Sequence, residues 1–146
     1  MAYEALNFTA FKKIIDLTVN SGRLYSSDIV STYPLVYTAT NAYFSGVMDL
    51  YGNIHFVPFS GSVGQKVSQA GLVSTYSLIY TASTAYCGGV LSTNGEIHFI
   101  PYSATVGQKI SASGTVSTYS LAYTTANAYV GGVLGLNGDI HFVPSS

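Results

Sequence analysis

Short apolar runs recur along the chain at a fixed interval. One unit reads AYCGGVLSTNGEIHFIP (residues 85–101), and close copies occupy residues 42–58 and 128–144. His55, His98 and His141 lie 43 residues apart and align the three copies. Each copy has two short apolar runs on either side of a polar, glycine-containing segment, which is the pattern of two β-strands joined by a reverse turn. The repeat therefore predicts three β-hairpins.

Three features of the copies support the hairpin interpretation. Asn94-Gly95 and Asn137-Gly138 predict the turn, because asparagine and glycine reach positive φ at low cost. The first copy keeps a glycine and moves its asparagine to Asn53. Paired glycines inside a strand indicate a close approach of another backbone or a bend. A proline, which cannot donate to a β-ladder, closes each second strand; these are Pro58, Pro101 and Pro144.

Two further strands are predicted in each repeat. TYSLIYT (residues 75–81) alternates large and small side chains, and Val106–Ile110 forms another short apolar run before a turn. Four short strands in about 43 residues are typical of one β-propeller blade. The chain is accordingly divided into a leader at 1–29 and a three-repeat segment at 30–146, with repeats at 30–72, 73–115 and 116–146.

The leader contains one ambiguous segment at residues 10–20. Thr9 can cap a short helix that ends near Gly22, whereas the alternation of residues 15–20 is that of a half-buried strand. We favour a strand over 14–19. Repeat three stops after Pro144, so we expect it to lack its fourth strand, and FKKII (residues 11–15) resembles VGQKI (residues 106–110). The leader is therefore predicted to supply a closing strand.

The motif GGVL-x-x-NG-x-IHF, continued by VGQKI, resembles the repeats of kelch-like β-propellers, in which paired glycines open the second strand of each blade. The resemblance covers residues 30–146, although the kelch tryptophan is absent. The repeats of this chain also resemble tandem repeats in structural proteins of phages and large viruses. The resemblance implies an all-β fold of three four-stranded blades.

Three blades do not close a ring, because propellers hold roughly four to eight of them. An open fan exposes apolar faces and a sheet edge, both of which favour association. We therefore predict half of a six-bladed propeller that is completed by oligomerisation, with a homodimer favoured. The alternative fold is a β-trefoil, which also has three repeats of four strands and closes within one chain.

Composition and charge narrow the possible partners. The 146 residues carry a net charge of −1 with 8% charged residues, which gives too few cations for a surface that follows phosphates, so nucleic acid is not expected. No apolar run reaches the roughly 18 to 20 residues of a membrane helix, and the N-terminus lacks the order of a signal peptide. Cys87 is the one cysteine, which excludes an intrachain disulfide.

The candidate catalytic groups favour structural roles. The repeated histidines have no Cys or carboxylate set repeated beside them, so we predict no metal and no cofactor. Asp49, Glu96 and Asp139 do not form the paired carboxylates of an acid–base site. Lys66 and Lys109 are expected to be edge charges, and the counterparts of Cys87 are apolar, which favours a buried thiol. We predict that the protein is not an enzyme.

The repeated tyrosines are the remaining candidates for binding. Tyrosine rings beside Ser, Thr and Asn side chains can stack on sugars, and they can equally fill the space between blades. We name Tyr33, Tyr76 and Tyr119 as candidate ligand-binding residues. The prediction is a structural or assembly protein of a virion or extracellular particle surface, such as a capsid decoration, tail or fibre part. The alternative is a multivalent carbohydrate-binding lectin.

Overall fold

The structure, a computed structural model, describes residues 32–145. The chain divides into two units, residues 1–33 and residues 34–146, and the fold below is that of the second unit. The strand predicted over 14–19, the alternative helix and the FKKII segment all lie outside the described residues. Within 32–145, no helix is long and apolar enough to cross a membrane.

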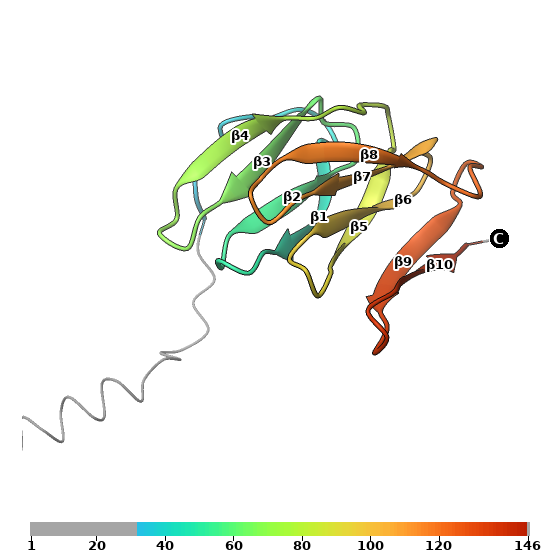
Figure 1. The fold of residues 1–146 in the computed structure, drawn as a ribbon. Coiled ribbons are helices and arrows are strands. Elements are labelled where there is room, and N and C mark those ends of the chain that lie inside the picture. The colour runs from blue at the N-terminus through green and yellow to red at the C-terminus, as the bar shows by residue number, and fades with distance from the viewer. Residues whose placement is uncertain (1–31, 146) are drawn as a thin grey trace, which may run out of the picture. The chain divides into compact units, whose positions relative to one another are not determined.

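The second unit is built from three antiparallel sheets, shown in Figure 1. Sheet A has the order β1-β2-β3-β4, sheet B has the order β5-β6-β7-β8, and sheet C contains β9 and β10. Sheet A comprises β1 (Tyr43–Met48), β2 (Ile54–Pro58), β3 (Val63–Val67) and β4 (Val73–Ser77). Sheet B comprises β5 (Tyr86–Leu91), β6 (Ile97–Pro101), β7 (Val106–Ile110) and β8 (Val116–Ser120). Sheet C comprises β9 (Tyr129–Leu134) and β10 (Ile140–Pro144).

Consecutive strands pair with their neighbours, so sheets A and B are four-stranded meanders. The prediction of an all-β chain of repeated four-stranded antiparallel sheets is confirmed for these two sheets. The described residues form separate sheets rather than the closed barrel of the β-trefoil alternative. The completion of a six-bladed ring by oligomerisation stays a prediction.

The strand predicted at 75–81 is displaced and joins a different sheet. Strand β4 runs over Val73–Ser77 and is the outer strand of sheet A, although it opens the second sequence repeat. Residues 78–85 leave sheet A and cross to β5, the first strand of sheet B. The buried Gln108 side chain stabilises this crossing, since its Oε1 accepts the backbone N–H groups of Ile79 and Tyr80 at 2.9 and 2.8 Å. Each sheet is therefore offset from the sequence repeats, and sheet C has two strands rather than the expected three.

The hairpin turns need positive φ at glycine alone. In sheet B the Ser92 N–H donates to the Glu96 carbonyl at 2.8 Å, which leaves a three-residue loop in which Gly95 has a φ of 82°. Such a loop is a turn followed by one left-handed residue. The turns predicted at the two Asn-Gly pairs are present, but Asn94 and Asn137 have negative φ and glycine alone supplies the left-handed residue. This explains how the first copy can move its asparagine to Asn53.

The inner strands of adjacent sheets approach closely at the predicted glycines. A Cβ on Gly89 of β5 would lie 2.8 Å from Val47 Cγ1 of β1, and one on Gly132 of β9 would lie 2.9 Å from Val90 Cγ2 of β5. Side chains at these glycines would separate the sheets. The described apolar core lies between sheets A and B and includes Val57, Ala85, Tyr86, Ile97, Phe99, Ala104 and Ile110.

Candidate functional site

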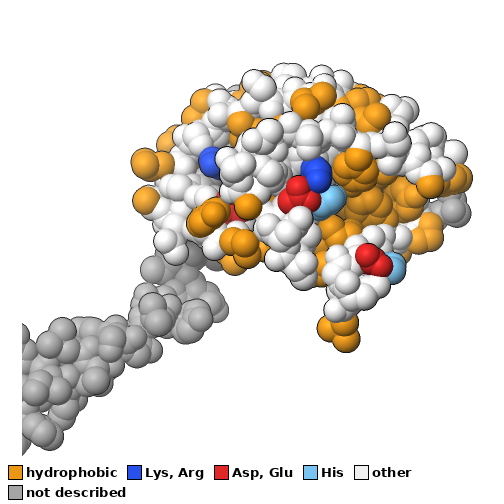
Figure 2. All heavy atoms as spheres, viewed as in Figure 1, with side chains coloured by type: hydrophobic (Ala, Val, Ile, Leu, Met, Phe, Trp, Pro, Cys, Tyr) orange, Lys and Arg blue, Asp and Glu red, His pale blue; other side chains and the backbone are white. Residues whose placement is uncertain are grey.

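A polar cleft lies between sheets B and C. It has a volume of about 390 Å³ and combines hydroxyl, amide, carboxylate and imidazole groups with two aromatic rings. The wall from sheet B carries Glu96, His98 and Tyr119, and the wall from sheet C carries Asp139 and Phe142. Figure 2 shows charged and histidine side chains beside a broad area of apolar side chains on this face.

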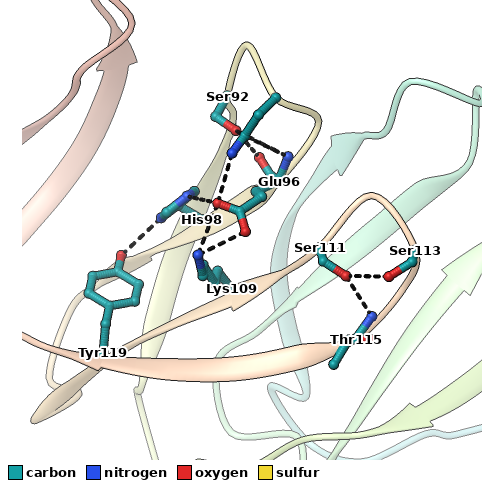
Figure 3. A network of polar contacts seen from close by, with 9 residues as sticks. Ser92, Glu96, His98, Lys109, Ser111, Ser113, Thr115 and Tyr119 are labelled. Carbon is teal, nitrogen blue, oxygen red and sulfur yellow. Dashed lines mark hydrogen bonds and ion pairs between the residues drawn. The ribbon is translucent and has the colours of Figure 1, made fainter.

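Glu96, the residue before β6, connects the groups on the sheet B wall. Its carboxylate oxygens accept from Lys109 Nζ at 2.8 and 2.9 Å, and His98 Nε2 lies 3.5 Å from one of them (Figure 3). The Lys109 ammonium group is the main cause of a lowered Glu96 pKa, and the Asn94 amide adds to it. Glu96 is therefore the anionic centre of this wall at neutral pH.

His98 links Glu96 to Tyr119 on the outer strand. Its Nδ1 lies 3.3 Å from the Tyr119 hydroxyl, and the two rings are 5.5 Å apart between centroids. Burial lowers the His98 pKa against the opposing effect of Glu96, so the neutral ring is favoured. Burial also raises the pKa of Tyr119 to about 12. The tyrosine thus acts as a neutral hydrogen-bond partner.

Sheet A repeats this arrangement with a different carboxylate. His55 Nε2 lies 3.2 Å from Asp49 Oδ2, and His55 Nδ1 lies 3.4 Å from the Tyr76 hydroxyl. Burial lowers the His55 pKa, although Asp49 opposes the shift. In sheet A the position of Glu96 is occupied by Asn53, which has no carboxylate. The carboxylate that contacts the histidine comes instead from Asp49, on the other side of the hairpin turn. His55 and His98 are thus each held by partners within their own sheet, whereas His141 in sheet C is exposed.

The glycine preceding each buried glutamine gives the tyrosine its place. A Cβ on Gly64 would lie 2.1 Å from the Tyr76 ring, and one on Gly107 would lie 2.2 Å from the Tyr119 ring. Each ring therefore lies flat over a residue that has no side chain. The sequence contained this signal, VGQK followed by VSTY, but the contact could not be inferred without the strand pairing.

Two of the three candidate tyrosines, Tyr76 and Tyr119, lie in different sheets rather than in one site. Tyr76 and Tyr119 occupy equivalent places in different sheets, and Tyr119 lines the cleft. Tyr33 is 43% exposed and lies outside the unit that forms the sheets. Their role in binding a ligand stays a prediction.

The remaining predicted residues have structural surroundings. Lys109 is engaged by Glu96, and burial is the main cause of a raised Cys87 thiol pKa. The Cys87 thiol also lies 3.4 Å from the Tyr129 carbonyl oxygen, in a cavity lined by Phe44, Phe59, Tyr102 and Val130. Within residues 32–145, no cluster of three or more His, Cys, Asp or Glu side chains could hold a metal ion.

Comparison with known proteins places this architecture among propeller-like folds. Similar solved structures include a streptogramin B lyase, at 23% identity and a TM-score of 0.65 over 77% of this chain and 37% of that one. Selenomethionine-substituted virginiamycin B lyase from Staphylococcus aureus is 19% identical, with a TM-score of 0.61 over 73% and 36%. A catalytically inactive variant of that lyase, solved with quinupristin, is 21% identical, with a TM-score of 0.59 over 70% and 34%.

These likenesses concern the fold, because the identities are low and the chain spans about a third of the length of the lyases. The streptogramin B lyases are β-propellers, so the class defined here is an all-β repeat protein with propeller-like sheets. No protein-family model and no curated protein matches the chain. The kelch-like and viral resemblances remain sequence-based interpretations.

Proposed function

We propose that this protein is a non-enzymatic assembly module that associates with copies of itself through its propeller-like sheets. The observation that carries the proposal is the incomplete sheet C. Within the described residues, no strand pairs with the outer edge of β10, whereas the equivalent strands β2 and β6 each pair on both sides. An unpaired strand edge is a template for pairing with another chain.

Both strands of sheet C and the turn between them also expose apolar side chains. Val130, Val133 and Val143 are 54%, 60% and 44% exposed, and Leu136 at the tip of the hairpin is fully exposed. Exposed apolar groups on a sheet with an open edge favour association, because contact with a second surface removes them from water. The low charge of the chain offers little electrostatic repulsion to oppose this contact.

Native mass spectrometry and sedimentation velocity test the proposal. We expect a species of at least twice the 15.4 kDa chain mass that persists at micromolar concentration. A single monomeric species across that concentration range would overturn the self-association proposal. The location in a virion or on a particle surface stays a prediction of the sequence, and mass-spectrometric detection of the protein in purified particles would test it.

A lectin function is the second candidate, and the cleft between sheets B and C is the observation that favours it. Tyr119 and Phe142 offer ring surfaces, while Asn94, Glu96 and Asp139 offer groups that bond hydroxyls. A glycan array with the intact chain tests this function. Binding that is reduced by the exposed-site change Asp139→Ala would support it, and an array without signal would contradict it.

The non-enzyme prediction has a direct test, because the similar solved structures are those of lyases. One of them was solved with quinupristin. We expect this chain to leave quinupristin unchanged when the mixture is followed by liquid chromatography and mass spectrometry. Conversion that scales with protein concentration would contradict the non-enzymatic proposal.

A further inference from the structure

The cleft between sheets B and C has an equivalent between sheets A and B that is much smaller. The smaller cleft has a volume of about 90 Å³, compared with about 390 Å³ for the larger one. Equivalent residues line both, such as His55 in one and His98 in the other. The difference is one wall: Ile110–Gly114, the end of β7 and its turn, closes the smaller cleft. Sheet C has no described strand in that place.

The pairing in the complete sheets shows what the β10 edge would accept. In sheet A, Ile54 pairs with Val67 and His55 with Lys66. In sheet B, Ile97 pairs with Ile110 and His98 with Lys109. Strand β10 carries the same sequence, IHFVP, so Ile140 is expected to face an apolar residue and His141 a cation.

Two side chains of sheet C also match groups that have partners in sheet B. Asp139 corresponds to Glu96, which binds Lys109 at 2.8 Å, and Asp139 is exposed. Tyr129 corresponds to Tyr86, whose hydroxyl donates to the Val106 carbonyl at 3.0 Å. The Tyr129 hydroxyl makes no such bond within residues 32–145. An incoming strand therefore needs a cation and a backbone carbonyl at defined positions.

The 43-residue spacing identifies a segment of the chain with these properties. Residues 20–24 lie one repeat before β3 and two repeats before β7. Residues 30–33 lie one repeat before β4 and two before β8, and they read VSTY, the sequence with which β4 and β8 begin. Arg23 stands at the position of Lys109, and Leu24 at that of Ile110. Residues 20–31 lie outside the described residues. Residues 20–24 keep the 43-residue spacing to Val63–Val67 and Val106–Ile110. The FKKII segment at residues 11–15, which resembles VGQKI, does not keep this spacing.

The segment departs from the repeats at two positions. Ser21 stands where Gly107 lies under a tyrosine ring, and Gly22 stands at the position of Gln108. The glutamine stabilises the crossing between sheets through its own Oε1 atom. The match therefore predicts that residues 20–24 pair with β10 and that Arg23 contacts Asp139. It also predicts that the segment crossing from β8 to β9 lacks the hydrogen bonds that a buried glutamine gives to the crossing from β4 to β5.

We propose that residues 20–33 of a second copy of this chain complete sheet C by pairing with the outer edge of β10. Leu24 of the second copy covers Ile140 and fills the larger cleft, and its Arg23 binds Asp139. The second copy is the occupant because the three sheets of residues 32–145 do not close a ring, whereas the sheets of two copies provide six. This inference rests on the proposed self-association and names the surfaces that carry it.

Substitution of Leu24 in the full-length chain tests the inference. Its counterparts Val67 and Ile110 are 7% and 2% exposed, so Leu24→Asp would bury a carboxylate without a partner. We expect the self-association constant, measured by sedimentation, to fall by about 100-fold or more. Ser27→Asp is the matched control, because its counterparts Ala70 and Ser113 are exposed, and it should leave association within a few-fold of the parent.

Mixing two variants separates pairing between copies from pairing within one. Leu24→Asp disables the segment and Ile140→Asp disables the edge, so an equimolar mixture regains one intact contact between different copies. We expect each variant alone to be largely monomeric and the mixture to form a mixed dimer. Dimers of Leu24→Asp as stable as the parent would overturn the inference while leaving self-association intact, and a mixture that stays monomeric would overturn pairing between copies.

Charge reversal provides an independent measurement at the ion pair. Arg23→Glu and Asp139→Arg should each weaken association several-fold, as expected for an ion pair at a surface, and the double variant should recover most of the loss. If the double variant associates more weakly than either single variant, the two losses add instead of compensating, and the Arg23–Asp139 contact is overturned. A monomeric parent chain would overturn both this inference and the proposed function.

Discussion

Strands β6 and β10 have nearly the same sequence but very different surroundings. Residues 97–101 read IHFIP and residues 140–144 read IHFVP. In β6, Ile97, Phe99 and Ile100 are 1%, 0% and 4% exposed. Strand β6 lies between β5 and β7, Ile97 and Phe99 belong to the apolar core with Val57 of sheet A, and Ile100 lies against Gly132 of sheet C. In β10, Val143 is 44% exposed and the outer edge is open. Burial is therefore a property of a strand's neighbours, and equal sequence does not give equal stabilisation.

The largest difference is expected for the two equivalent phenylalanines. Phe99→Ala removes a fully buried ring and should lower the free energy of unfolding by about 3–5 kcal/mol. Phe142 is partly exposed, so Phe142→Ala should cost less than half as much in dilute solution. Urea denaturation of both variants at one low protein concentration measures the two costs. Equal costs would contradict the contrast between the strands.

A smaller difference is expected for two equivalent glycines on the partner strands. A Cβ on Gly88 would lie 2.7 Å from Ile100 Cδ1, which the buried surroundings of Ile100 hold in place, whereas one on Gly131 would lie 3.6 Å from Val143. Gly88→Ala should therefore destabilise the protein by about 1–3 kcal/mol through overpacking. Gly131→Ala should change stability by less than about 0.5 kcal/mol. Thermal unfolding of the pair checks the ranking, and a larger cost at Gly131 would reverse it.

The smallest effect concerns the pH dependence of stability. The His98 pKa is lowered from 6.5 by burial, so the unfolded chain binds this proton more readily than the folded one. Stability contributed by the neutral ring is complete above pH 6.5 and is lost as pH falls through the folded-state pKa. His98→Gln should therefore flatten the decrease in unfolding free energy between pH 7 and pH 5. A steeper decrease in the variant would show that the sign is wrong.

The sequence predicted much of the local structure. The 43-residue spacing located the hairpins, the glycines that allow close approach, and the prolines that close the strands. It could not locate the edge of each sheet, because the VSTY strand is equally consistent with either neighbouring sheet. Pairing decides this: Val106–Ile110 pairs with Val116–Ser120 in one register, which places Tyr119 over Gly107 and beside His98.

Residue types and their spacing alone determined that this chain is an all-β repeat with glycine turns and without a clear catalytic set. Only the tertiary structure decided which copies are buried, because burial depends on what packs against a strand. It also joined Glu96, His98, Lys109 and Tyr119 into one network from three strands of sheet B. Hydrogen bonds between distant residues depend on register, and register is fixed when strands meet rather than by any one segment of sequence.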